Sequence, residues 1–308
     1  MRKFNQFAIL LLLLQTILYC SDIRVYFSPS QKVDRLIMDR MLQAKKSVYI
    51  ATYTFGWNEG FETLEKLAKK GIDIKILLQF PQENINFKHT HIKIKQWNKK
   101  NCRLHAKFIV IDGKYVFAGS ANFTENSLIW DSNNIVFFDN ENAGKVFAEN
   151  FLLLWNGSMD CKTYKDQTVE IYFSPVYDCT QIIRNEIGKA QDNIKFAMFS
   201  FTSDSIAEEI CRIGLKGVKI YGIFEGSQNP VSNEYDFLKR FHFFNIKKDC
   251  FVENIHDKFT VIDEKTVLTG SFNYTESARK NIETLIVIKR PDITALYSRR
   301  WKHLWLWY

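Results

Sequence analysis

The stretch His105-Ala-Lys-Phe-Ile-Val-Ile-Asp112, followed by Gly119-Ser-Ala-Asn122, occurs again 151 residues further along the chain. The second copy reads His256-Asp-Lys-Phe-Thr-Val-Ile-Asp263, followed by Gly270-Ser-Phe-Asn273. Both copies keep the same spacing of His, Lys, Asp, Gly-Ser and Asn. A match at so many fixed positions rarely arises by accident, so two copies indicate a duplicated functional element.

The duplication extends on both sides of this motif. Residues 23–29 match 169–175, residues 44–55 match 190–201, and residues 70–76 match 216–222. The offset is 146 residues in these three blocks and 151 at the motifs, so the second half contains five additional residues in between. We therefore expect two homologous halves, at residues 21–160 and 161–308, after an N-terminal segment at residues 1–20.

The order of predicted elements in each half is β-α-β-α-β, followed by the motif. Residues 48–55 have the composition of a strand, residues 58–70 carry apolar side chains at helical spacing, and residues 72–80 form the next strand. Residues 108–111 and 115–118 are expected to form a hairpin around Asp112-Gly113. The sequence thus predicts an α/β fold.

The motif side chains are expected to converge at a strand end. His105 and Lys107 alternate with Ala106, which would place both on one face of a single strand. Asn122 follows the partner strand of the hairpin. In βα architectures such strand ends are where sites form.

The residue types of the two motifs suit cleavage of a phosphate ester. Two lysines can neutralise the phosphate oxygens, one histidine can attack phosphorus, and the other can protonate the leaving alcohol and later activate water. Histidine can supply both protonation states near neutral pH. We expect no metal and no cofactor, because the lysines supply the positive charge. The candidate catalytic residues are His105, Lys107, Asn122, His256, Lys258 and Asn273.

Two such HxK(x)4D(x)6GSxN motifs resemble those of the phospholipase D superfamily, and the duplication covers nearly the whole chain after residue 20. The resemblance implies two α/β/α sandwich halves packed about a pseudo-twofold axis, with one site at their interface. It also implies that His105 is the nucleophile and His256 the general acid, and that the lysines and asparagines bind phosphate. The supporting residues are Asp112, Ser120, Asp263, Ser271 and Glu283.

The chain departs from the superfamily pattern downstream of the motifs. Members often carry a Glu there that orients a histidine, and Glu283 fits this position. With the offset of 151, the corresponding first-half residue is Ser132, next to Asp131. This asymmetry raises the alternative that His256 is the better-oriented histidine. Glu283 could also be an ordinary surface residue.

The N-terminus and the composition bear on location and partners. Arg2 and Lys3 precede an apolar run at residues 7–20, which is typical of a signal peptide and short for a membrane span. We expect an exported or membrane-anchored protein, in the periplasm, at the cell surface or secreted, with lipidation at Cys20 as a further alternative. The net charge of +8 favours anionic partners.

Several weaker signals leave alternatives open. Cys161 and Cys179 could form a disulfide or remain free. His89 and His91 could bind a metal, although a polar loop is the better interpretation. The C-terminal tryptophans are more typical of a packed helix than of an interfacial anchor. Basic residues upstream of each motif could guide a polyanion or be plain solvated loops; they are Lys88, Lys93, Lys95, Lys99, Lys100, Lys239, Arg240, Lys247 and Lys248.

Three classes of function fit these observations. We place first a phospholipase D that hydrolyses a phospholipid phosphodiester, with a phosphatidyl transferase similar to cardiolipin synthase as a variant. The second is a metal-independent endonuclease acting on DNA or RNA, which the basic charge favours. The third is a non-catalytic binding protein, which two intact motifs disfavour. Because both half-sites lie in one chain, we expect a monomer.

Overall fold

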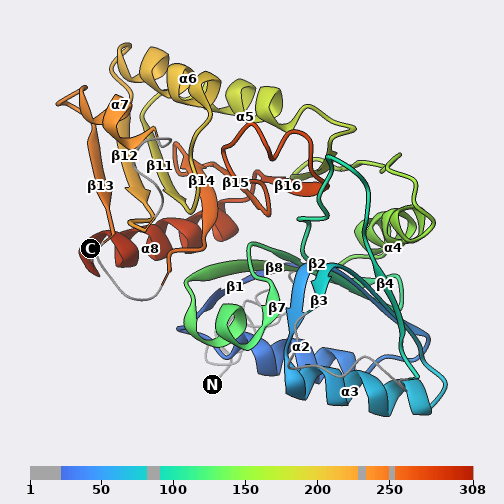
Figure 1. Ribbon diagram of the computed structural model, residues 1–308. Coiled ribbons are helices and arrows are strands. Elements are labelled where there is room, and N and C mark those ends of the chain that lie inside the picture. Colours follow the sequence, from blue (N-terminus) through green and yellow to red (C-terminus); the bar gives the residue numbers. More distant parts are fainter. Residues whose placement is uncertain (1–21, 82–90, 228–233, 250–253, 308) are drawn as a thin grey trace, which may run out of the picture.

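The computed structural model describes residues 22–81, 91–227, 234–249 and 254–307, and these residues form two mixed β-sheets (Figure 1). The first sheet contains β1 (Ile23–Ser28), β2 (Ser47–Gly56), β3 (Asp73–Pro81), β4 (Lys93–Gln96), β5 (Phe108–Ile111), β6 (Tyr115–Gly119), β7 (Phe123–Thr124) and β8 (Asn133–Asp139). The second contains β9 (Tyr164–Lys165), β10 (Val169–Ser174), β11 (Asn193–Met198), β12 (Lys219–Phe224), β13 (Asn245–Lys248), β14 (Lys258–Ile262), β15 (Thr266–Gly270) and β16 (Glu283–Ile288). The expected targeting segment at residues 1–20 lies outside the described residues.

The two sheets share one topology, which confirms the predicted pair of homologous α/β halves. The first has the strand order β1-β8-β6-β5-β2-β3-β4, and the second has the equivalent order β10-β16-β15-β14-β11-β12-β13 with β9 added at its edge. In each sheet one strand, β2 or β11, pairs parallel with β3 or β12 and antiparallel with β5 or β14. The predicted boundary at residues 160 and 161 lies in the connection that precedes β9.

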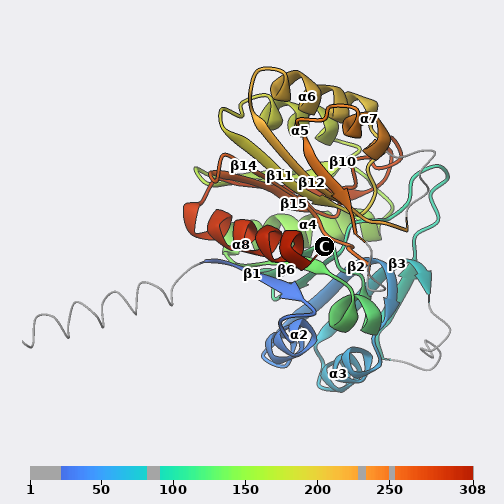
Figure 2. The same cartoon turned by 90° about the vertical axis from the view of Figure 1, so that its left-hand side faces the viewer.

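The helices and the two sheets form layers. Helices α2 (Val33–Met41) and α3 (Asn58–Lys69) cover the outer face of the first sheet, while α5 (Cys179–Ile187) and α6 (Asp204–Gly214) cover that of the second (Figure 1). Helices α4 (Glu141–Trp155) and α8 (Pro291–Trp307) lie between the two sheets, as the turned view confirms (Figure 2). The short helices η1 (Asn126–Trp130) and α7 (Tyr235–Lys239) belong to connections.

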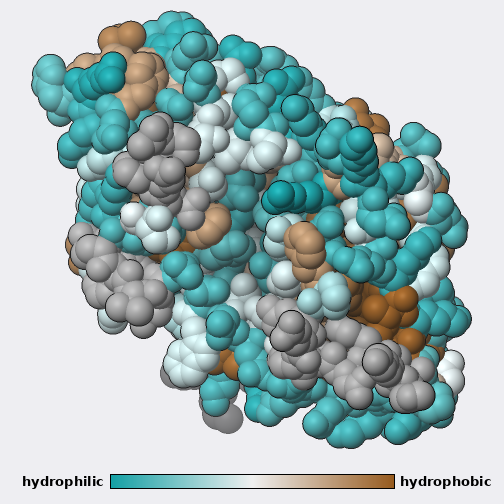
Figure 3. Space-filling view, viewed as in Figure 1, coloured by the Kyte–Doolittle hydropathy of each residue, from teal (hydrophilic) through white to brown (hydrophobic). Residues whose placement is uncertain are grey.

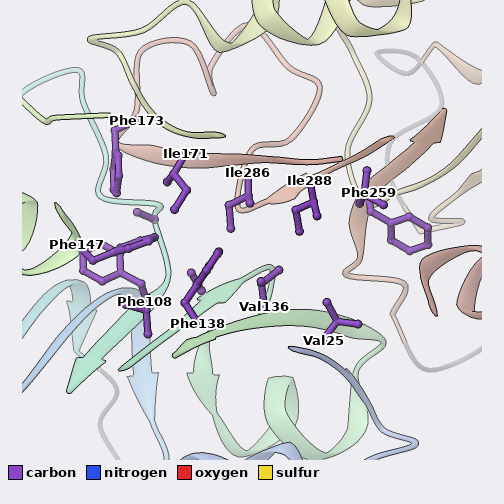
Figure 4. Packing of buried hydrophobic residues seen from close by; sticks show 14 of the residues in the cluster. Val25, Phe108, Val136, Phe138, Phe147, Ile171, Phe173, Phe259, Ile286 and Ile288 are labelled. Atoms are coloured by element: carbon purple, nitrogen blue, oxygen red, sulfur yellow. The ribbon is translucent and has the colours of Figure 1, made fainter. Parts of the chain in front are cut away.

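The space between the sheets is filled by a shared hydrophobic core. Side chains of both sheets and of α4 and α8 point toward one another there, among them Phe108, Phe147, Phe173 and Ile286 (Figure 4). Phe147 packs edge-to-face against both Phe108 and Phe173, with ring centroids 5.0 and 5.4 Å apart. Burial of this much apolar surface favours a fixed arrangement of the halves, so residues of both halves can form one site.

The structure shows the state of the cysteines and of the C-terminal tryptophans. Cys161 and Cys179 are both buried free thiols, and burial raises the pKa of Cys161 to about 12. The C-terminal tryptophans belong to helix α8, with Trp301 buried and Trp307 exposed. None of the helices in the described part of the chain has the length and apolar character needed to cross a bilayer. The face in Figure 3 is mainly hydrophilic, with apolar residues scattered over it.

Candidate active site

The two histidines lie at the interface of the two halves, where their backbone segments form hydrogen bonds with each other. The backbone N–H of His105 donates to the carbonyl of Ile282 in the other half at 2.9 Å, and that of His256 donates to the carbonyl of Ser132 at 2.9 Å. Both contacts continue as isolated parallel bridges, at Leu104 with Ile282 and at Ser132 with Ile255. Each histidine is therefore held by the opposite half.

This geometry corrects the expectation that His105 and Lys107 belong to one strand of their own sheet. Strand β5 begins only at Phe108, and His105 precedes it. In the second half β14 begins at Lys258, so His256 also lies outside the sheet. Periodicity within one half could not reveal this, because the backbone N–H of each histidine donates to a carbonyl of the other half.

The imidazoles have unequal partners. His105 Nδ1 lies 2.8 and 2.9 Å from the two carboxylate oxygens of Glu283, which is 1% exposed. His256 Nδ1 lies 2.9 Å from the amide oxygen of Asn133. The suggestion that His256 is the better-oriented histidine is wrong, because the carboxylate contacts His105. The alternative that Glu283 is a surface residue is also excluded by its burial.

Asn133, and not Ser132, is the structural counterpart of Glu283. Asn133 pairs with Ser28 in the first sheet, as Glu283 pairs with Ser174 in the second. The offset between the halves thus falls from 151 to 150 residues in the loop before β8. That loop contains the π-helix η1, and a π-helical turn accommodates one extra residue. The extra residue explains why counting from the motif points to Ser132.

The motif serines hold these partners in place. Ser120 Oγ donates to Asn133 Oδ1 at 2.8 Å, and Ser271 Oγ donates to Glu283 Oε2 at 2.6 Å. The amide of Asn133 also donates from Nδ2 to the carbonyl of Ser127 at 2.9 Å, which directs its oxygen toward His256. An oxygen there requires a donor, so the Nδ1 of His256 carries its proton.

The glycine before each serine is required by close backbone contact. A Cβ on Gly119 would lie 2.1 Å from the carbonyl oxygen of Asn134, and one on Gly270 would lie 2.2 Å from that of Thr284. Gly270 also has a φ of +126°, a backbone conformation that residues other than glycine rarely adopt. The Gly-Ser pair therefore lets the motif loop lie directly against β8 or β16.

The two motif lysines are completely buried beside the histidines. Lys107 Nζ donates to the carbonyl of His105 at 2.5 Å, and Lys258 Nζ donates to that of His256 at 2.7 Å. Burial lowers the pKa of Lys107 to about 7, opposed by the charge of Glu283. Burial and the charge of Lys107 lower the pKa of Lys258. Because the charge of Lys107 acts on Lys258, a bound anion would stabilise the charged forms of both lysines.

Matched aromatic rings form the walls of the site. The ring of Tyr53 lies edge-to-face with His105 at 5.1 Å, and that of Phe199 with His256 at 4.6 Å. The same rings lie 5.6 Å from Lys107 Nζ and 4.8 Å from Lys258 Nζ. These rings exclude water from the ammonium groups, which strengthens their attraction for a bound anion.

The motif asparagines leave polar atoms without partners. Among the described residues, Oδ1 of Asn122 and Oδ1 of Asn273 are buried and make no hydrogen bond. Buried polar atoms normally have partners, so a matched pair of exceptions indicates where a ligand completes the site. Turning either amide by half a rotation would present its NH2 group, the donor that a phosphate oxygen needs.

Asp112 and Asp263 have a structural position away from the histidines. Asp112 accepts backbone N–H groups of Lys45, Lys46 and Ser47 at 2.8 to 3.2 Å. Asp263 accepts the corresponding N–H groups at residues 191–193. Each carboxylate thus fixes the loop that leads into β2 or β11.

Burial lowers the pKa of both histidines, but the charged groups around them differ. Burial lowers the pKa of His105, and the neighbouring carboxylate of Glu283 opposes this shift. Burial lowers the pKa of His256 well below its usual value, and the charges of Lys258 and Lys107 lower it further. The mutual effects of these groups place all four side chains in one electrostatic environment.

The residues considered for metal binding and for guiding a polyanion lie only partly within the described part of the chain. His89 falls outside the described residues, and those described include no group of three or more His, Cys, Asp or Glu placed to hold a metal ion. Lys95 Nζ donates to the carbonyl of Trp155 at 2.6 Å, and Lys247 Nζ donates to that of Trp305 at 2.5 Å. These two basic residues thus cap the ends of α4 and α8.

A family model described as "Cardiolipin synthase, PLD-like domain" matches residues 37–155 and again residues 183–305. The chain belongs to the phospholipase D superfamily. Both matched segments contain one complete motif, and together they account for most of the chain. The protein is therefore an enzyme of phosphodiester chemistry, as the predicted site residues implied.

The curated relatives match less than half of this chain. A phospholipase D of Rickettsia conorii is 28% identical over 138 residues, which cover 43% of this chain and 67% of the relative. A mitochondrial cardiolipin hydrolase of Chlamydomonas reinhardtii is 27% identical over 121 residues, covering 39% of this chain and 54% of the relative.

A solved structure shares the complete two-half architecture. Phosphatidylserine synthase of Haemophilus influenzae superposes with a TM-score of 0.71, over 91% of this chain and 85% of its own. The identity is 13%, so the likeness concerns the fold alone. It confirms the predicted arrangement of two phospholipase D-like halves.

Proposed function

We propose that the protein is a phospholipase D that hydrolyses a phospholipid phosphodiester through a phosphohistidine, with His105 as the nucleophile and His256 as the general acid. The observation that carries the assignment of roles is the unequal pairing of the two imidazoles, with a carboxylate at one and a neutral amide at the other.

The carboxylate suits a nucleophile. When Nε2 of His105 attacks phosphorus, its ring gains positive charge, and Glu283 stabilises that charge at Nδ1. The same hydrogen bond keeps the proton on Nδ1 and the lone pair on Nε2. The bond from phosphorus to the leaving oxygen breaks as the bond to Nε2 forms.

The amide suits a proton donor. Asn133 orients His256 without stabilising its cation, so protonated His256 is a strong acid toward the leaving oxygen. The negative charge of a bound diester favours this protonated form and offsets the effect of Lys107 and Lys258. After the alcohol departs, neutral His256 can take a proton from water, whose oxygen then attacks phosphorus and displaces Nε2 of His105.

The names of the relatives and the use of basic residues support a lipid substrate. Both curated relatives are named for activity on phospholipids. Lys95 and Lys247, which could have guided a nucleic acid, are instead engaged in internal contacts. The net charge of +8 favours nucleic acid as the second candidate substrate.

A direct comparison of substrates tests this proposal. Protein beginning at residue 21 is assayed on mixed phospholipid vesicles and on single-stranded and duplex nucleic acid, each with excess EDTA and at two salt concentrations. We expect release of a lipid headgroup that persists with EDTA. Cleavage of nucleic acid alone would exclude the lipid substrate, and chelator-sensitive activity restored by a divalent metal would exclude the mechanism.

The role of each histidine is tested by trapping the intermediate. His256→Ala should accumulate a phosphohistidine at residue 105 with an activated diester such as bis-p-nitrophenyl phosphate, whereas His105→Ala should form none. A phosphorylated peptide that contains His256 would reverse the two roles.

A further inference from the structure

A buried ion pair includes Asp257, the residue that follows His256 in the chain. Arg300 of α8 and Asp257 are 7% and 0% exposed, and Arg300 Nη2 lies 3.6 Å from Asp257 Oδ2. The same nitrogen donates to Ser132 Oγ at 2.7 Å and to the carbonyl of Ser28 at 2.8 Å. Asp257 also accepts from Ser132 Oγ and from Asn134 Nδ2.

These contacts surround the residue that orients His256. Ser132 and Asn134 are the chain neighbours of Asn133, and Ser28 is its pairing partner in the first sheet. Residues of the second half thus bind both sides of Asn133 and the strand beside it. The carbonyl of Ser132 in turn accepts the backbone N–H of His256.

The residues that the structure describes in the first half include no equivalent of this ion pair. The residue after His105 is Ala106, in the place of Asp257. With the offset of 150 that applies beyond η1, the counterpart of Arg300 is Asn150, which bonds to the backbone of Lys162 instead. The offset is supported by Trp155 and Trp305, whose carbonyls accept equivalent lysines.

We propose that Arg300 and Asp257 are positioning residues for proton transfer by His256. They hold Ser132 and Asn134, and through them the amide of Asn133, which keeps the Nε2 of His256 directed at the leaving oxygen. This inference rests on the proposed roles of the two histidines. His105 is positioned independently by Glu283, so attack on phosphorus does not depend on the ion pair.

The dependence of the cleavage rate on the leaving group distinguishes a loss of proton transfer from a general loss of activity. A p-nitrophenolate can depart without a proton, whereas a phenolate is a stronger base and needs general acid catalysis more. Loss of positioning should therefore slow cleavage of diphenyl phosphate far more than release of the first p-nitrophenolate from bis-p-nitrophenyl phosphate. General acid catalysis contributes about 10²- to 10⁴-fold, so the difference should be at least about tenfold.

The test variant is the double substitution Asp257→Ala/Arg300→Asn, which copies Ala106 and Asn150 of the first half and leaves no buried charge unpaired. We expect its pre-steady-state burst with bis-p-nitrophenyl phosphate to stay within about threefold of wild type, while kcat/KM for diphenyl phosphate falls at least about tenfold. His256→Ala provides the reference profile. Arg290→Gln, beside the start of α8 and paired with Asp22 and Asp292, is the control and should match wild type.

Each outcome decides the question. Equal slowing with both diesters, or slowing with neither, would refute a positioning role. If the double variant does not fold, Ser132→Ala removes the hydroxyl between Arg300 and Asp257 with both charges retained, and it should show the same selectivity at smaller size. If the wild-type protein cleaves neither diester and forms no phosphohistidine, the proposed function itself fails, and the positioning role fails with it.

Discussion

Replacing Glu283 by Gln should slow attack on phosphorus by about one to two orders of magnitude through the weakened hydrogen bond, and further through the tautomer of His105. A hydrogen bond to a buried charged group contributes about 1.5–3 kcal/mol, and Glu283 lies 2.8 Å from His105 Nδ1. Since 1.36 kcal/mol corresponds to a tenfold change in rate, this loss alone slows the step by roughly 10- to 150-fold.

The tautomer of His105 adds to this loss. Glu283 accepts hydrogen bonds from both His105 Nδ1 and Ser271 Oγ, whereas Gln offers a single oxygen and an NH2 group. If the NH2 group faces the imidazole, the proton moves to Nε2 and removes the lone pair that attacks. The burst of p-nitrophenolate from bis-p-nitrophenyl phosphate, followed by rapid quench, measures this step.

A matched substitution controls for the loss of a carboxylate. Glu170→Gln lies on β10 of the same sheet, where Glu170 pairs with Lys289, and should leave the burst unchanged. A burst rate for Glu283→Gln within threefold of wild type would show that the carboxylate does not activate His105. The assignment of the nucleophile would then have to be abandoned.

Two further outcomes are expected. The ammonium of Lys107 is charged below its pKa of about 7, so competitive inhibition by tungstate should be constant at lower pH and weaken about tenfold per pH unit above it. Lys107→Arg, which stays charged, should abolish that dependence, and inhibition that is flat in the wild-type protein would contradict the lowered pKa. Asp112→Ala should lower the free energy of unfolding in urea by about 2–4 kcal/mol, because the N–H groups of Lys46 and Ser47 lose their acceptor. Its kcat per folded molecule should not change, and a large loss of kcat at unchanged stability would give Asp112 a catalytic role.

The repeat in the sequence predicted most of the fold. The spacing of the two motifs gave the pair of halves, and the patterns at residues 48–55 and 58–70 correspond to β2 and α3. The edge strand β4 escaped prediction because Lys93–Gln96 is short, largely exposed and mainly polar, so it has no apolar alternation. Tertiary pairing with β3 makes it a strand.

The pairing of the catalytic groups was harder to predict. Sequence spacing identifies residues within one half, whereas Glu283 binds His105 across the interface. Asn133 was missed because the π-helix η1 shifts the register by a single residue, and one residue separates a buried partner from its neighbour Ser132. A comparison of the strand pairs of Ser28 and Ser174 reveals the correct match.

The pairing of His105 with Glu283 and of His256 with Asn133 also bears on which bond of a substrate breaks. In an assembly of two identical halves, both histidines would have the same partner, and a diester could bind in either direction. Here the two halves are parts of one chain, so the substitution of Asn for Glu affects one histidine only. A diester of two different alcohols should then bind in a single direction and always lose the same alcohol. The duplication thus permits regioselective cleavage, which a symmetric site can obtain only from the shape of its substrate.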